Sequence, residues 1–168
     1  MTRWVPCYVA IGCNVGDCAA NFRRATDALD TLPETLPWRR SRVFRTKPVG
    51  GVAQADYFNA VLATLTRLSP DDLLTQLQRI EADAGRCRRT EQRWGPRSLD
   101  LDLLVYGAVQ RGDTALTLPH PRMAERNFVL LPLAELAPDL VVPRIGHVAR
   151  LARRCTDDGM QWQRNFEW

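Results

Sequence analysis

The chain has 168 residues, of which 45% are hydrophobic and 25% charged, with a net charge of +4. This is the composition of an ordinary soluble globular protein, so disorder is not expected, and the length predicts one domain over residues 1–168. The sequence contains no apolar run near the ~20 residues that span a bilayer, and its N-terminus lacks the apolar core of a signal peptide. We therefore expect a cytoplasmic location without a membrane partner.

The cysteines and arginines do not by themselves indicate a function. Arginine supplies almost all of the positive charge, since Lys47 is the one lysine. Arginine suits two-pronged binding of phosphate, although an arginine bias can also follow from the base composition of a genome. The five cysteines are odd in number and form no C-x-x-C pair, so we expect no disulfide framework or zinc site, only small buried hydrophobes or incidental thiols in a reducing compartment. They are Cys7, Cys13, Cys18, Cys87 and Cys155.

The first half of the chain predicts the order strand, helix, strand, strand, helix. An apolar strand over 7–11 ends at Gly12, and apolar residues at helical spacing predict a helix over about 17–32. Strands follow over 39–46 and 58–68. Ser69 then caps a helix that has Pro70 at its first position and ends at Gly85.

The second half begins with an arginine-rich loop and a strand over 99–106. A hairpin is expected from Gly112 to Leu118, then a helix over about 123–137 that Pro132 kinks or divides, then a short strand over 140–142. The core order is that of a ferredoxin-like βαββαβ sandwich of the α+β class, with an antiparallel-rich sheet. We expect helices on one face of the sheet and a site on its free face.

Two carboxylates lie inside the second-half strand, at D-x-D spacing. Residues two apart on a strand point to the same face, so Asp100 and Asp102 project together, opposite the leucines at 99, 101 and 103. Asp is depleted from strands and like charges repel, so the pair predicts a cation, for which Mg²⁺ fits best. The alternative is a half-exposed strand that carries Asp twice, because the motif is short.

The common nucleotide motifs are absent. The sequence has no G-x-x-x-x-G-K-[ST], and no G-x-G-x-x-G follows a strand. Gly12 to Asp17 is better interpreted as a tight turn than as a phosphate loop. Taken alone, His120 would be a loop histidine, and Tyr57 and Phe128 would pack in the core.

Several segments together resemble the 6-hydroxymethyl-7,8-dihydropterin pyrophosphokinase family over almost the whole chain. G-P-R-x-L-D-L-D is highly specific to that family. The matching segments are G-C-N-V-G-D at the first turn, F-R-T-K-P-V-G, D-Y-F-N, I-E-A-D-A-G-R, W-G-P-R-S-L-D-L-D-L-L-V-Y-G and L-P-H-P-R-M-A-E-R-N-F-V-L-L-P-L-A-E-L-A-P.

The resemblance implies an enzyme of folate synthesis in which the pterin hydroxyl attacks the β-phosphorus of ATP and AMP leaves. It implies that Asp100 and Asp102 hold two Mg²⁺ ions and act in catalysis with Arg86 and Arg97, which grip the triphosphate. The implied ATP-binding residues are Gln78, Arg86, Arg97, Leu103, Thr117, His120 and Arg126.

For the pterin, the resemblance implies an aromatic sandwich of Tyr57 and Phe128, with Asn59 on the amide edge of the ring. Trp94 would close over the ring from a mobile loop between Gly85 and Leu99. Backbone contacts would come from Thr46, Pro48 and Val49.

The chain also departs from the commonest family pattern, mainly in its loops. Cys13 stands where serine is usual, Lys47 separates Thr46 from Pro48, and Ala115 replaces an arginine of certain members. The loop over 86–94 is one residue longer than in some relatives. These changes bear on loop closure and nucleotide affinity more than on the reaction.

Two other classes of function stay open at this point. One is an RNA-binding ferredoxin-like module, although the R-G-F-x-F-V-type strand is missing and carboxylates on the sheet would repel phosphate. The other is a pseudo-enzyme that keeps the fold as an interaction surface. For the enzyme we expect a monomer that binds ATP and the pterin and no nucleic acid.

Overall fold

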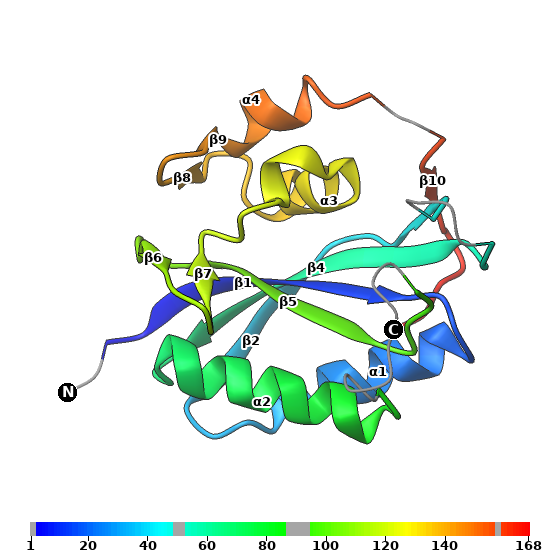
Figure 1. Ribbon diagram of the computed structural model, residues 1–168, viewed down its shortest axis with the longest axis horizontal. Helices are drawn as coiled ribbons and strands as arrows, with labels where there is room; N and C mark the ends of the chain where they lie inside the picture. Colours follow the sequence, from blue (N-terminus) through cyan, green and yellow to red (C-terminus); the bar gives the residue numbers. More distant parts are fainter. Residues whose placement is uncertain (1–2, 49–52, 87–94, 157–158) are drawn as a thin grey trace.

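In the computed structural model, residues 3–48, 53–86, 95–156 and 159–168 are described (Figure 1). The helices are α1 (Cys18–Asp30), α2 (Pro70–Asp83), the 3₁₀ helix η1 (Met123–Glu125), α3 (Asn127–Leu136) and α4 (Val148–Ala152). The strands are β1 (Val5–Cys13), β2 (Thr35–Arg40), β3 (Phe44–Thr46), β4 (Tyr57–Thr66), β5 (Asp100–Tyr106), β6 (Arg111–Gly112), β7 (Thr117–Leu118), β8 (Val141–Val142), β9 (Gly146–His147) and β10 (Gln161–Trp162).

The main sheet is antiparallel and has the expected ferredoxin-like topology. Its strands follow the order β10-β3-β4-β1-β5, and β2 also pairs with β4. The two central strands, β1 and β4, pair over nine positions, from Val5 opposite Thr66 to Cys13 opposite Phe58. β5 lies on the other side of β1, which brings Asp100 opposite Gly12 and Asp102 opposite Ala10.

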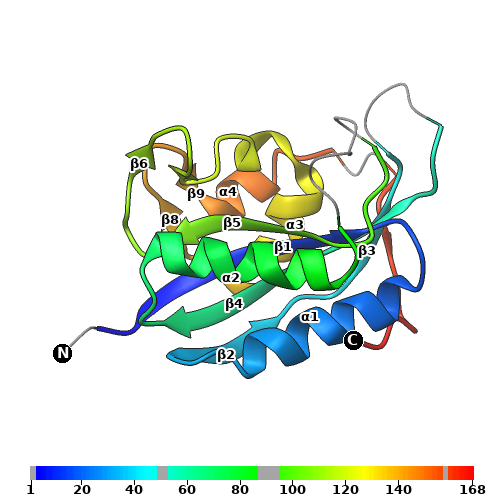
Figure 2. The same cartoon turned by 60° about the horizontal axis from the view of Figure 1, so that its bottom comes forward.

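Helices cover both faces of this sheet, so the expectation of a free face was wrong. α1 and α2 lie side by side on one face (Figure 2), and their apolar stripes pack on Val9, Ile11 and Leu101. α3 and α4 lie on the opposite face (Figure 1), where Val129 and Leu133 of α3 pack against Val61 of β4. α3 is apolar around most of its surface, because it is itself enclosed by the sheet and α4.

A bulge in β5 lets this strand contribute side chains to both cores and to the site. Leu101 and Leu103 face α1 and α2, whereas Leu104 and Val105 both face α3. The pairing with β1 shifts by one residue here, since Tyr8 lies opposite Val105 and Val9 opposite Leu103. An extra residue of this kind re-aims side chains within a strand. On the face toward α3, Asp100 and Asp102 therefore occupy the first half of β5, and Leu104 and Val105 occupy the second half.

Three predicted elements differ from the structure. The strand expected over 39–46 is two strands, β2 and β3, because both pair with β4 and the chain between them turns, with the Ser41 amide donating to the Val61 carbonyl at 3.0 Å. The helix expected over 123–137 divides at Arg126, before α3, and Pro132 lies inside α3. The first strand passes through Gly12 and ends at Cys13.

The C-terminal residues return to the sheet. β10 pairs with β3, and the C-terminus lies beside α1 (Figure 2). The rings of Phe166 and Trp168 lie 5.3 and 5.1 Å from that of Phe22 in α1. Within the described residues, no helix has both the length and the apolar character needed to cross a membrane.

Candidate active site

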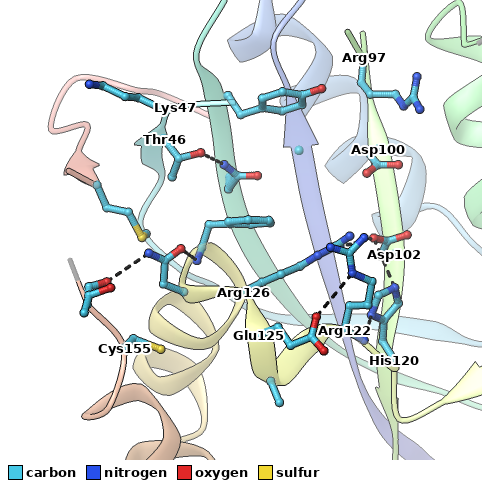
Figure 3. Close-up of a pocket in the computed structure, with 18 of the residues that line it drawn as sticks. Thr46, Lys47, Arg97, Asp100, Asp102, His120, Arg122, Glu125, Arg126 and Cys155 are labelled. Carbon is cyan, nitrogen blue, oxygen red and sulfur yellow. Dashed lines mark hydrogen bonds and ion pairs between the residues drawn. The ribbon is translucent and has the colours of Figure 1, made fainter. Parts of the chain in front are cut away.

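A cavity of about 840 Å³ opens where β1 ends and β4 and β5 begin, beside α3, and its size is typical of a ligand site. Its lining is mostly polar and brings together residues that are far apart in sequence (Figure 3). One wall carries Asp100, Asp102, His120 and Arg126. The opposite part is lined by residues of β3 and β4 and by Phe128.

The two aspartates point into this cavity from one face of β5, as their spacing predicted. Asp100 and Asp102 are each about one third exposed, whereas Leu101 between them is buried in the core. Burial raises the pKa of Asp102 above its usual value, and the negative charge of Asp100 raises it further. This position therefore disfavours two negative charges side by side, and a bound cation would offset their repulsion.

Arginines supply positive charge from two segments. The Arg86 side chain is 8% exposed, and its Nη1 donates to both Asp100 Oδ1 and Glu81 Oε1. Glu81 lies in α2, is 1% exposed, and also accepts from the Leu101 amide at 2.7 Å. Glu81 therefore fixes Arg86 and the start of β5 together.

On the other side, Arg126 and His120 are directed at Asp102 (Figure 3). Arg126 Nη1 lies 3.4 Å and His120 Nε2 3.7 Å from Asp102 Oδ2. The His120 amide donates to the Leu104 carbonyl at 2.8 Å, so the bulged part of β5 positions this loop. Burial lowers the pKa of His120, against the opposing effect of Asp102. Nδ1 of His120 accepts from the Arg122 amide at 3.2 Å, which leaves Nε2 as the donor toward the cavity in the neutral ring.

The turn after β1 holds Arg97 in the cavity wall. The amides of Asn14 and Val15 donate to the Arg97 carbonyl at 2.9 and 3.1 Å. In return, the Arg97 amide donates to Asn14 Oδ1 at 2.7 Å. Arg97 and Asp100 line the same cavity (Figure 3).

Four of the residues expected around the pterin, Thr46, Tyr57, Asn59 and Phe128, line the opposite part. Asn59 Nδ2 donates to Thr46 Oγ1 at 2.8 Å, and both side chains are buried at the cavity wall. The Tyr57 hydroxyl donates to the Gly95 carbonyl at 2.8 Å, which joins β4 to the segment before β5. Phe128 lies in the first turn of α3, with the Arg126 guanidinium 5.6 Å from its ring centre.

Other predicted site residues lie elsewhere or cannot be placed. Gln78 and Thr117 are exposed on α2 and β7, and Leu103 is buried in the core under α1 and α2. These three residues are not among the described residues that line the cavity. Pro48, which is half-buried after β3, does not line it either. Val49, Trp94 and most of the loop expected to close over the site lie outside the described residues.

Sequence reasoning missed several residues of the cavity. Gly12 lies under the site, where an added Cβ would stand 3.3 Å from Asn59 Oδ1. Arg122 also lines the cavity, and the sequence analysis did not name it although it lies two residues after His120. The C-terminal segment was left without a form, yet Arg154, Thr156 and Met160 line the cavity. The sequence signal for the Gly12 part of the cavity was the G-C-N-V-G-D turn, which begins with that residue.

The cysteine expectation was also wrong in part, because Cys13 and Cys18 form a disulfide. The turn between β1 and α1 brings their Cα atoms to 5.6 Å, within the range that a disulfide needs. Cys7 is buried as expected, with its pKa raised to about 12 by burial. Cys155 is half-buried, and Cys87 lies outside the described residues.

An antiparallel ferredoxin-like sheet with a cavity lined by paired carboxylates, five arginines and the aromatic residues Tyr57 and Phe128 is typical of a protein that handles an anionic substrate. Comparison with known proteins gives the family. The family model described as 7,8-dihydro-6-hydroxymethylpterin-pyrophosphokinase (HPPK) matches residues 8–138. The chain belongs to this family of pyrophosphokinases, which act in folate biosynthesis.

Individual relatives agree. The chain is 42% identical over 154 residues to the 2-amino-4-hydroxy-6-hydroxymethyldihydropteridine pyrophosphokinase of Pseudomonas aeruginosa, covering 92% of this chain and 94% of that one. The protein of the same name from Methylorubrum extorquens is 45% identical over 142 residues, covering 84% and 87%. The HPPK-DHPS of Plasmodium falciparum superposes with a TM-score of 0.69 at 11% identity. That alignment covers 92% of this chain and 42% of the other, and it shows the fold alone.

Proposed function

We propose that this chain transfers a pyrophosphoryl group from ATP to the hydroxymethyl group of 6-hydroxymethyl-7,8-dihydropterin. The hydroxyl oxygen attacks the β-phosphorus, the bond from that phosphorus to the α-phosphate oxygen breaks, and AMP leaves as the hydroxyl proton is lost. The observation that carries this proposal is the division of one cavity into a charged wall, with Asp100 and Asp102 among arginines, and a wall built for a ring.

The charged wall suits the triphosphate. Arg86 and Arg97 approach from the segment before β5, and Arg126 with His120 approach from the segment before α3. Guanidinium groups on opposite sides can hold the transferred group in line between attacking and leaving oxygens. His120 in its neutral form can still donate from Nε2 to a phosphate oxygen.

Asp100 and Asp102 fit Mg²⁺. The described ranges contain no cluster of three or more His, Cys, Asp or Glu side chains that could hold a metal. Mg²⁺ is commonly held by one or two carboxylates plus waters and substrate phosphates, so two aspartates beside a triphosphate site are sufficient. We propose that they hold two Mg²⁺ ions, which would neutralise phosphate charge when bound.

The other wall suits the pterin. Tyr57 and Phe128 offer ring faces, and Asn59 offers an amide that can both donate and accept at the edge of the heterocycle. Thr46 and its neighbours Pro48 and Val49 would add contacts, and Trp94 would close the site. Gln78, Leu103 and Thr117 remain predicted contacts of the nucleotide.

The test is the identity of the nucleotide product. Purified protein with ATP, Mg²⁺ and the pterin alcohol should form AMP and no ADP, as resolved by anion-exchange chromatography. Asp100→Asn and Asp102→Asn should each lower this activity by at least about 100-fold. Asp27→Asn, which changes an exposed carboxylate on α1, serves as the matched control and should keep full activity. Absence of pterin-dependent AMP at saturating Mg²⁺ would overturn the proposal.

We further propose a cytoplasmic monomer that binds no nucleic acid. An RNA-binding role would need a sheet face that attracts phosphate, whereas β5 presents two carboxylates there. Filter binding of RNA with a steep salt dependence would count against this proposal. Sedimentation equilibrium would test the monomer.

A further inference from the structure

A disulfide closes the turn that carries Asn14. Cys13 ends β1 and Cys18 begins α1, so the bond ties the end of a central strand to the start of a helix. Both cysteines are buried, at 0% and 6% exposed. In the family that the chain resembles, serine is usual at position 13, so this bond is not expected throughout that family.

One side of this turn holds the nucleotide half of the site. Three hydrogen bonds join it to Arg97, namely those from the Asn14 and Val15 amides to the Arg97 carbonyl and that from the Arg97 amide to Asn14 Oδ1. The start of α1 adds a fourth bond to the same segment, from Asn21 Nδ2 to the Ser98 carbonyl at 2.9 Å. The backbone that carries Arg97 therefore depends on the turn and on α1 together.

The other side of the turn holds the pterin half. Asn14 Nδ2 donates to the Ala55 carbonyl and to Gln54 Oε1, each at 3.0 Å. The Tyr57 hydroxyl donates its one proton to the Gly95 carbonyl at 2.8 Å, and its oxygen lies 3.3 Å from Gln54 Oε1. One buried asparagine thus joins the segment before β4 to the segment before β5.

We propose that the Cys13–Cys18 disulfide is a redox-sensitive positioning element of this site, acting through Asn14 on Arg97 and Tyr57. The inference rests on the proposed function. When the bond is closed, the turn has few conformations and both halves of the site are preformed. When it is open, substrate binding must order the turn as well, and this cost falls on the affinity for ATP and for the pterin.

The opening step is thiol–disulfide exchange with an external dithiol. Two electrons and two protons pass from the dithiol to the protein, so that the S–S bond breaks, two S–H groups form on Cys13 and Cys18, and the reductant becomes a cyclic disulfide. Re-oxidation by a disulfide of the same class reverses the exchange.

Reduction is expected to change KM but not kcat. Reduction should raise the KM for ATP and the KM for the pterin together, each by at least about fivefold. The kcat should change by less than about twofold, because saturating substrates restore the ordered turn. Mere loss of folded protein would lower kcat and leave both KM values unchanged.

The experiment compares wild type in thiol-free buffer under argon with the same protein after dithiothreitol, measuring AMP formation at varied ATP and pterin. Alkylation with N-ethylmaleimide and peptide mass measurement reports whether Cys13 and Cys18 are paired. The variant Cys13→Ser/Cys18→Ser should show the high KM values in both buffers. Cys7→Ala, which changes a buried cysteine away from the turn, should keep the low KM values and the response to dithiothreitol.

Amide exchange gives a readout that does not need turnover. The amides of Asn14, Val15 and Arg97 should exchange at least about tenfold faster after reduction. Equal KM values in the two buffers with unchanged exchange of these amides would overturn the proposal, as would full alkylation of both cysteines without reductant. Absence of pterin-dependent AMP in either buffer would overturn the proposed function instead, and the exchange rates would still decide the role of the disulfide.

Discussion

The buried carboxylate of Glu81 should be one of the costliest side chains to remove. Glu81→Ala deprives the Leu101 amide of its acceptor, and an orphaned buried amide costs about 1–3 kcal/mol. It also removes one of two carboxylates from a guanidinium that is 8% exposed, and breaking a buried ion pair from one side costs about 3–5 kcal/mol. Because Arg86 retains Asp100, the two costs do not add fully, and we expect a loss of about 3–5 kcal/mol in the free energy of unfolding.

Urea denaturation followed by circular dichroism measures this loss. Glu81→Gln keeps the volume and an amide oxygen for Leu101, so it should lose only about 1–3 kcal/mol. Asp83→Ala, at an exposed position of the same helix, should stay within about 0.5 kcal/mol of wild type. In both Glu81 variants kcat/KM should also fall, by at least about tenfold, since Arg86 is no longer held from two sides. A Glu81→Ala protein within about 1 kcal/mol of wild type would refute this account of the buried pair.

Three further predictions test other parts of the molecule. Gly12→Ala places a Cβ 3.3 Å from Asn59 Oδ1, so the KM for the pterin should rise more than that for ATP, and equal KM changes would contradict the placement of the pterin. The hydrogen bond from Arg111, with those from backbone amides, lowers the pKa of Asp113 from 3.8 to about 2. Asp113 therefore contributes stability above pH 3.8 that is lost as the pH falls through about 2, and urea titrations should show a smaller acid-induced loss in Asp113→Asn. Cys7, buried and with a pKa of about 12, should resist iodoacetamide at pH 8 until urea is added, as peptide mass mapping can show.

What the sequence predicted well was local. Alternation along β5 depends only on the geometry of a strand, so the common face of Asp100 and Asp102 followed from their spacing. The Ser69 cap followed in the same way from groups within one turn of the helix, and its hydroxyl accepts from the Asp72 amide at 3.1 Å.

What the sequence did not predict depends on partners distant in the chain. The break between β2 and β3 exists because β4 pairs with each of them separately. The second layer of helices follows from burial of α3 on both sides, which gives no one-sided pattern to recognise. The disulfide depends on the geometry of the turn that brings Cys13 beside Cys18, and sequence spacing alone does not fix that geometry. The part of the site that could be predicted is therefore the charged strand, and the unpredicted part is its supporting contacts.

The pairing of Arg86 with two carboxylates would allow the proposed site to serve both a cation and a triphosphate. Asp100 can release Arg86 when it takes up a cation, because Glu81 continues to neutralise the same guanidinium. Arg86 then stays near the cavity with donors available for phosphate, and it is not left as an unpaired buried charge. Asp102 faces Arg126 and His120, which approach from the other side of the strand. Each aspartate thus has a cationic partner from a different segment, and in the proposed function the phosphates would give those partners new acceptors when the aspartates hold the metal.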